Sequence, residues 1–201
     1  MLINGSKLLG CPILSLHVGG KIAEVQAPII DPSDLKIIAY KIDGPTIRDE
    51  VGNILQTQRV REFSNIGMIV DSSDDFVFLD DVVRLKEIAD LHFNLIGLKV
   101  ETKKGSRLGK IIDYMVDTED FQVRQILVKR PAIKALMDPE LLISYSQITE
   151  VTDDKVIVKS EEDKLKKAAS KEDFVPNFVN PFREQQFAPV KSQNPDAKDI
   201  E

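Results

Sequence analysis

The stretch GSRLGKIIDYMVD, residues 105–117, follows the same pattern as GGKIAEVQAPIID, residues 19–31. Each stretch begins with glycine, has a basic residue in third place and an aliphatic residue in fourth, and ends with aspartate. The offset of 86 positions that relates Gly19 to Gly105 continues beyond the two stretches. It also pairs Ile42 with Val128, Pro45 with Pro131 and Ile47 with Ile133. A register that persists in this way predicts an internal duplication.

Shorter matches extend the duplication on both sides. LLGCPI (8–13) matches LIGLKV (95–100) at an offset of 87, and FSNIG (63–67) matches YSQIT (145–149) at an offset of 82. The second match predicts a loop that is four residues longer in the first copy. We therefore expect a first unit at residues 1–85, a helical connector at 86–94, a second unit at 95–159 and a C-terminal tail at 160–201.

Each unit is expected to be mostly strand, because short β-branched and aliphatic stretches alternate with Gly, Asp and Pro. VDSSDDFVFLDD (70–81) and EVTDDKVIVKS (150–160) place acidic and small residues between apolar runs, which predicts a hairpin at each. Several short strands in so small a unit favour a curled or closed sheet, since closure removes exposed edges. The sequence predicts a mainly β chain of two small barrels.

A short helix is expected between the two units. DDVVRLKEIADLHF (80–93) has apolar residues near helical spacing, and Asp80 or Asp81 is available as the N-cap. The apolar residues are Val82, Leu85, Ala89 and Phe93.

The pattern of the second unit resembles the PRC-barrel family. An opening LxGxxV, a glycine–basic–aliphatic hairpin, a central strand pair and a closing hairpin with VIV carry the resemblance. The matching residues are Ile96, Gly97, Val100, Gly105, Leu108, Gly109, Ile111, Asp113, Ile126–Val128, Ile148 and Val156–Val158. The first unit departs from the pattern, because Ala23 stands where the second has Gly109 and the loop from Gly44 to Arg59 is expected to be longer.

The resemblance implies a small β-barrel that other proteins use as a docking surface. Such barrels occur in the cytoplasmic part of the photosynthetic reaction-centre H subunit, in the ribosome-maturation factor RimM and as stand-alone proteins, and none of these uses the barrel as a catalyst. RimM pairs its PRC barrel with a different N-terminal barrel, whereas this chain has a second PRC-like copy.

Composition sets the class of protein. The chain has 201 residues, 42% of them hydrophobic, with no Trp and one cysteine, Cys11. A single cysteine excludes an internal disulfide, and the N-terminal stretch has no signal-peptide pattern. No apolar run reaches the length of a membrane span, so any membrane contact would be peripheral. The sequence therefore predicts a cytoplasmic protein.

Residues with the potential for chemistry are isolated along the chain. His17 and His92 have no ligand-spaced partner, and Cys11 has no nearby histidine. The DSSDD run (71–75) lacks the glycine and distal glutamate of a calcium loop, and the GG at 19–20 lacks a phosphate-binding context. We expect no catalytic residue, no metal and no cofactor.

Positive charge gathers in the second unit. Nine lysines and arginines lie among five acids between residues 99 and 134, although the whole chain carries a net charge of −6. The candidate partner-binding residues are Lys103, Lys104 and Arg107. They offer a surface for RNA, for anionic lipid or for the acidic first unit of another molecule, and the alternative is an ordinary solvated face. The acidic overall charge weighs against nucleic acid.

The tail is rich in phenylalanine and proline. Pro176 and Pro181 interrupt the spacing of its aromatic residues, so a regular helix is not expected and the tail is predicted to be largely disordered. Its aromatic side chains either dock into a partner or pack on the barrels. The candidate anchors are Phe174, Phe178, Phe182 and Phe187.

The sequence thus predicts a non-catalytic protein-interaction or assembly module built on tandem PRC barrels. The alternative is an RNA- or ribosome-associated maturation factor that resembles the RimM barrel. The partner, the oligomeric state and the pathway are not predicted.

Overall fold

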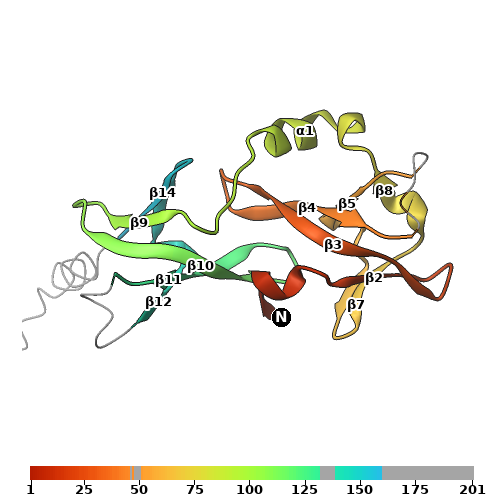
Figure 1. Cartoon of the computed structure of the whole chain (residues 1–201), viewed down its shortest axis with the longest axis horizontal. Helices are drawn as coiled ribbons and strands as arrows, with labels where there is room; N and C mark the ends of the chain where they lie inside the picture. The colour runs from red at the N-terminus through yellow and green to blue at the C-terminus, as the bar shows by residue number, and fades with distance from the viewer. Residues whose placement is uncertain (46, 48–50, 132–138, 160–201) are drawn as a thin grey trace, which may run out of the picture. The chain divides into compact units, whose positions relative to one another are not determined.

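Two seven-stranded sheets contain about half of the residues that the computed structural model describes, namely 1–45, 47, 51–131 and 139–159 (Figure 1). The first sheet has the strand order β6-β7-β2-β3-β4-β5-β8. Its strands are β2 (Pro12–Ser15), β3 (Gly20–Asp31), β4 (Lys36–Asp43), β5 (Ile54–Gln56), β6 (Glu62–Ser64), β7 (Gly67–Val70) and β8 (Phe76–Val77). The 3-10 helix η2 (Thr57–Arg59) follows β5.

The second sheet has the order β12-β11-β10-β9-β14-β13, and the N-terminal strand β1 (Leu2–Asn4) pairs with β10. Its other strands are β9 (Lys99–Thr102), β10 (Arg107–Asp117), β11 (Val123–Lys129), β12 (Glu140–Ser144), β13 (Ile148–Val151) and β14 (Lys155–Val158). The 3-10 helix η5 (Tyr145–Gln147) follows β12, and η1 (Gly5–Leu8) follows β1. The prediction of a mainly β chain is confirmed.

Six strands of each sheet follow one plan. Read from the other end and without β8, the first sheet has the order β5-β4-β3-β2-β7-β6, which corresponds strand for strand to the second. Among the described strands of each sheet, the one parallel pair joins the opening strand to the last hairpin, as β2 with β7 and β9 with β14. The other pairs in each sheet are antiparallel.

The irregularities of the two long hairpins also coincide. The β3–β4 ladder shifts between Val25 and Ala27, and the β10–β11 ladder shifts between Ile111 and Asp113. Each ladder has a second shift, and all of the shifts correspond at the offset of 86 that the sequence predicts. Because a bulge depends on one extra residue at one place, coincident bulges are a stringent sign of a common backbone plan.

The turns that close these hairpins share a backbone conformation and a hydrogen bond. Leu35 and Phe121 both adopt left-handed backbone angles, with φ of 56° and 58°. The amide of each donates to the carbonyl of an aspartate four residues earlier, Asp31 or Asp117, at 2.8 Å in both cases. Left-handed angles are uncommon outside glycine, so the shared conformation reflects one turn used twice.

The two turns also meet each other. Lys36 and Gln122 form an antiparallel bridge, the amide of Ile37 donates to the carbonyl of Phe121 at 2.9 Å, and the amide of Val123 donates to that of Leu35 at 3.1 Å. These contacts are reciprocal at the offset of 86, as they would be in a symmetric dimer in which each partner offers the same patch. One compact unit, Met1–Lys164, contains both sheets.

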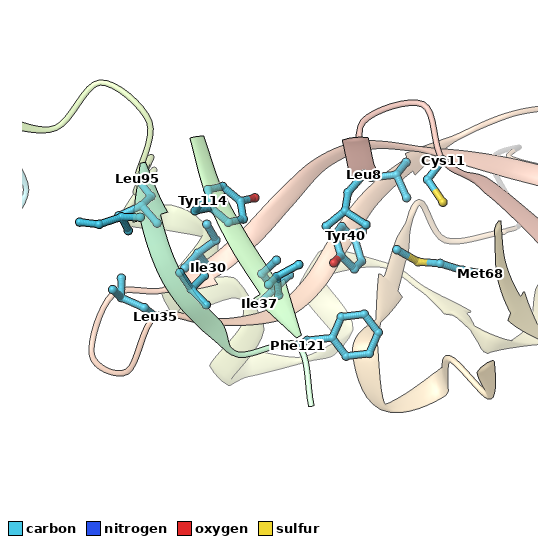
Figure 2. Packing of buried hydrophobic residues seen from close by; sticks show 14 of the residues in the cluster. Leu8, Cys11, Ile30, Leu35, Ile37, Tyr40, Met68, Leu95, Tyr114 and Phe121 are labelled. Atoms are coloured by element: carbon cyan, nitrogen blue, oxygen red, sulfur yellow. The ribbon is translucent and has the colours of Figure 1, made fainter. Parts of the chain in front are cut away.

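The two sheets share one hydrophobic core, which includes residues of these turns. Buried side chains from both sheets form one cluster, and Figure 2 shows ten of them labelled. The rings of Tyr40 and Phe121 meet edge to face, with centroids 6.1 Å apart. Burial of each such side chain contributes about 1.5–3 kcal/mol, so the core favours the joined arrangement of the sheets.

Each long hairpin has one glycine where its strands come closest. A Cβ on Gly109 of β10 would lie 2.0 Å from the carbonyl oxygen of Lys129 on β11. In the first sheet Ala23 replaces that glycine, and Gly44, which directly follows β4, supplies the space instead, because a Cβ there would lie 2.7 Å from the Cα of Ala23. The side chain of Ala23 is therefore accommodated because Gly44, which faces it, has none.

The one α-helix among the described residues is α1 (Val83–Asp90). Its buried residue Leu85 joins Ile29, Ala39 and Ile54 in a second apolar cluster, so the helix covers the first sheet (Figure 1). The expected cap is wrong: the N-cap is Val82, with no side-chain hydrogen bond, because Asp80 and Asp81 belong to the preceding 3-10 helix η4 (Leu79–Asp81).

One of the two expected hairpins differs from the structure. The hairpin at 150–160 is confirmed as β13–β14, but 70–81 is not a hairpin. There β7 and β8 do not pair, since β8 crosses to β5 and the DSSDD run forms the 3-10 helix η3 (Ser73–Asp75), closed by a capping box from Ser72.

The match between 63–67 and 145–149 is also wrong. YSQ is the helix η5, whose counterpart is η2 (TQR, 57–59), 88 positions earlier. The facing pairs Lys41–Ile54 and Leu127–Leu142 show that the first connection is two residues shorter, not four longer. The tail 160–201 lies outside the described residues.

Candidate functional site

The predicted basic residues lie at one end of β9 and β10. Lys103 and Lys104 are exposed on the turn between these strands, and Arg107 is exposed at the start of β10. Arg107 lies 3.8 Å from Glu101 and lines a groove that extends away from the turn. Lys103 and Lys104 do not line it.

Four lysines form a row across the second sheet. Lys155 of β14 pairs with Lys99 of β9, Lys99 pairs with Lys110 of β10, and Lys110 pairs with Lys129 of β11. Directly paired residues project from the same face of a sheet, and neighbouring strands are about 4.8 Å apart. We call these four residues the lysine row.

The lysine row is accessible and only partly neutralised. Lys99, Lys110 and Lys129 are exposed, and Lys155 is half-buried. Lys155 lies 3.5 Å from Glu101. Within the part of the chain that the structure describes, no carboxylate lies at ion-pair distance from Lys99, Lys110 or Lys129. Like charges directly opposite one another destabilise a sheet, so this row is not explained by folding.

The groove beside the row has an apolar wall. Its volume is about 530 Å³. The bulge between Ile111 and Asp113 leaves Ile112 unpaired and 37% exposed, and Ile112 lines the groove. A bulge is a recognised way to turn a side chain out of a regular ladder. The lining residues are Gly97, Lys99, Arg107, Gly109, Lys110, Ile111, Ile112, Lys129, Arg130 and Pro131, which we call the Ile112 groove.

The first sheet presents different chemistry at the same positions. Glu24 corresponds to Lys110, and Asp43 to Lys129, and these two acids pair across β3 and β4 as the lysines pair across β10 and β11. Pro12 corresponds to Lys99, and Gly67 to Lys155. Gln26 occupies the bulge position of Ile112. The two sheets therefore share a backbone plan but differ in the charge that they expose.

Other hollows lie near the contact between the sheets. One of about 620 Å³ is lined by Lys36 and Phe121, and one of about 440 Å³ beside α1 is lined by Lys41 and His92. Both acids and bases line the first hollow, whereas Lys41 is the one lysine, arginine or acid among the described residues that line the second. The Ile112 groove differs because its described lining has five basic residues and no acid.

The residues with potential for chemistry are separate in space or buried. Cys11 is buried in the core, where desolvation raises the pKa of its thiol. His17 is exposed near the β2–β3 turn, and His92 is exposed after α1. Across the described ranges, no group of three or more His, Cys, Asp or Glu side chains is arranged to hold a metal ion. The candidate anchors Phe174, Phe178, Phe182 and Phe187 lie outside the described residues.

The comparison with protein families locates one known domain. The family model of the PRC-barrel domain matches residues 89–165, a range that includes β9 to β14. A PRC-barrel domain is therefore present, and it contains the lysine row. The first sheet lies outside the match. No curated protein matches the chain. None of the helices in the described portion is long and apolar enough to cross a membrane.

Proposed function

We propose that this chain is a non-catalytic intracellular assembly module built from two tandem PRC-barrel-like copies. The observation that carries the proposal is the repetition of strand order, bulges and turn geometry in two sheets whose equivalent surfaces differ in charge. A duplicated scaffold with diversified surfaces is suited to holding unlike partners at a fixed separation. The reciprocal contact between the turns supports this, because it fixes one sheet against the other.

The proposed function also agrees with where the polar residues lie. Buried side chains of both sheets pack in one core. The positions at which the two copies carry opposite charges are exposed or half-buried. Exposed residues that vary on a common scaffold are where binding functions arise.

The lysine row favours a second candidate, an RNA- or ribosome-associated role, because basic side chains in a line attract phosphates. The net charge of −6 favours a protein partner over RNA, as does the lining of the Ile112 groove, whose described residues include no aromatic side chain.

The test is affinity capture with the full chain from its native cell, with and without ribonuclease, followed by reciprocal capture from the partner. We expect a protein that persists after ribonuclease treatment and recovers this chain in return. Loss of every protein upon ribonuclease treatment would contradict the assembly function and support the RNA-associated one.

A further inference from the structure

Repulsion between the like charges of the lysine row destabilises the second sheet, and the fold does not require lysines at these positions. Lys110 lies between Lys99 and Lys129, so it faces a like charge on both sides. The first sheet forms the same ladder with Glu24 at this position. A surface that is dispensable for the fold and unfavourable to it is a candidate for binding a ligand of opposite charge.

Ile112 adds an apolar contact next to the positive charges. It is exposed at the bulge and borders the same groove as Lys110 and Lys129. Gln26, its counterpart, would be the ordinary choice for a solvated position. An anionic ligand that binds through charge alone would gain nothing from contact with Ile112. A protein segment with both acidic and apolar side chains would bind the lysines and also pack on Ile112.

From these observations we infer that the lysine row and the Ile112 groove form a binding site for a protein segment whose carboxylates flank an apolar side chain. The carboxylates lie against the lysines, and the apolar side chain packs on Ile112. This inference rests on the proposed function, since it names the chemistry of the partner that the second sheet holds.

The assignment to an acidic protein segment follows from the groove's lining. The charged residues in the described part of the lining are all basic, which selects an anion. The described residues of the lining include no Phe, Tyr or Trp on which a base could stack, and such stacking is the usual means of holding single-stranded RNA. The site is also a concave groove beside a bulge, whereas adsorption to an anionic membrane favours an extended amphipathic face.

The test uses fluorescence anisotropy of the full chain with a labelled peptide that repeats Glu-Glu-Leu. Lys110→Glu should weaken binding by about tenfold, because it replaces one attractive surface pair with a repulsive one and neutralises its neighbours. Ile112→Gln, which installs the residue of the first sheet without changing the net charge, should weaken it severalfold. The matched control is Lys86→Glu on α1, which makes the same charge change and should leave binding within about twofold.

Two results would overturn the inference. One is equal binding of the peptide to the original chain and to Lys110→Glu. The other is binding of an RNA oligonucleotide, or of phosphatidylserine vesicles, that needs Lys110 but is indifferent to Ile112→Gln.

The capture experiment separates this inference from the proposed function. A partner protein that is recovered by the original chain and lost with Lys110→Glu supports both. Retention of the partner by that variant overturns the inference and leaves the assembly function in place, whereas failure of the original chain to capture any protein overturns the assembly function itself.

Discussion

Lys110 and Glu24 occupy the same position in two sheets of the same strand order, and they carry opposite charges. Each pairs with a residue of its own sign on the next strand, Lys129 or Asp43. Because the backbone plan is common, the difference lies in the side chains alone. The charge of each sheet can therefore be changed with little effect on its architecture.

Replacement of Lys110 with Glu should stabilise the chain. It converts two repulsive cross-strand pairs, with Lys99 and Lys129, into attractive ones, each with an effect of about 0.2–1 kcal/mol. The expected result is a higher midpoint in urea with an unchanged slope, and the gain should shrink in high salt. Lys86→Glu is the control, since it removes a favourable pair with Asp80 and should not stabilise. A lower midpoint for Lys110→Glu would contradict the repulsion in the lysine row.

Gly109→Ala should destabilise the chain by about 2–5 kcal/mol, because backbone strain of about 1–2 kcal/mol adds to overpacking of about 1–3 kcal/mol. Its backbone has φ of 151°, and the added Cβ would lie 2.0 Å from the carbonyl oxygen of Lys129, so the strands must move apart. Gly105→Ala is the matched control, because Gly105 has φ of 79° but open space around it and should cost about 1–2 kcal/mol. Chemical denaturation measures both. Equal losses would show that β10 and β11 are not held in close contact at Gly109.

Tyr40→Phe should leave the chain as stable or more stable at neutral pH. The hydroxyl of Tyr40 is buried, and the described residues offer it no hydrogen-bond partner, so its desolvation is not offset. Burial raises the pKa of Tyr40 well above the ordinary value. The unfolded chain therefore loses this proton above about pH 10 while the folded chain retains it, and stability falls as the pH rises.

The Tyr40→Phe variant should show a weaker loss of stability in that alkaline range. Urea midpoints at neutral and alkaline pH measure the difference. A variant that is less stable than the original chain at neutral pH would show that the hydroxyl has a partner.

The four tail phenylalanines give a prediction about binding. If Phe174, Phe178, Phe182 and Phe187 are partner anchors, their joint replacement with Ser should abolish capture of a partner and leave the melting temperature almost unchanged. If they cover a sheet, each loses burial that contributes about 1.5–3 kcal/mol, and the melting temperature should fall by many degrees. A large fall with capture intact would contradict the docking role.

The sequence predicted the parts of the fold in which residues align without a gap. The offset of 86 relates β3 to β10 and β4 to β11, and the offset of 87 relates β2 to β9. The alignment of the two copies was wrong after Gly44, because the connections there differ in length. A short chance match of 63–67 with 145–149 was preferred to the correct match of 57–59 with 145–147. The crossing of β8 to β5 was not predictable from local pattern, because turn residues alone do not show which strand the chain joins next.

The candidate site was predicted only in part. The excess of positive charge and Arg107 were found, but Lys103 and Lys104 are on the turn and do not line the groove. The lysine row depends on pairing across four strands. Lys155 and Lys99 are 56 residues apart in sequence and become neighbours because β14 and β9 pair in parallel. A signal was nevertheless present, because alignment at the offset of 86 places Lys110 against Glu24 and Lys129 against Asp43.

The most direct test of the account transfers the site from one sheet to the other. Glu24→Lys, Asp43→Lys and Gln26→Ile together give the first sheet the residues of the second at equivalent positions. Isothermal titration with the Glu-Glu-Leu peptide should then show two peptides bound per chain in place of one, because the shared bulge presents the introduced isoleucine as it presents Ile112. A stoichiometry that stays at one, in a variant that remains folded, would contradict the claim that two equivalent sheets differ in function through their exposed charges.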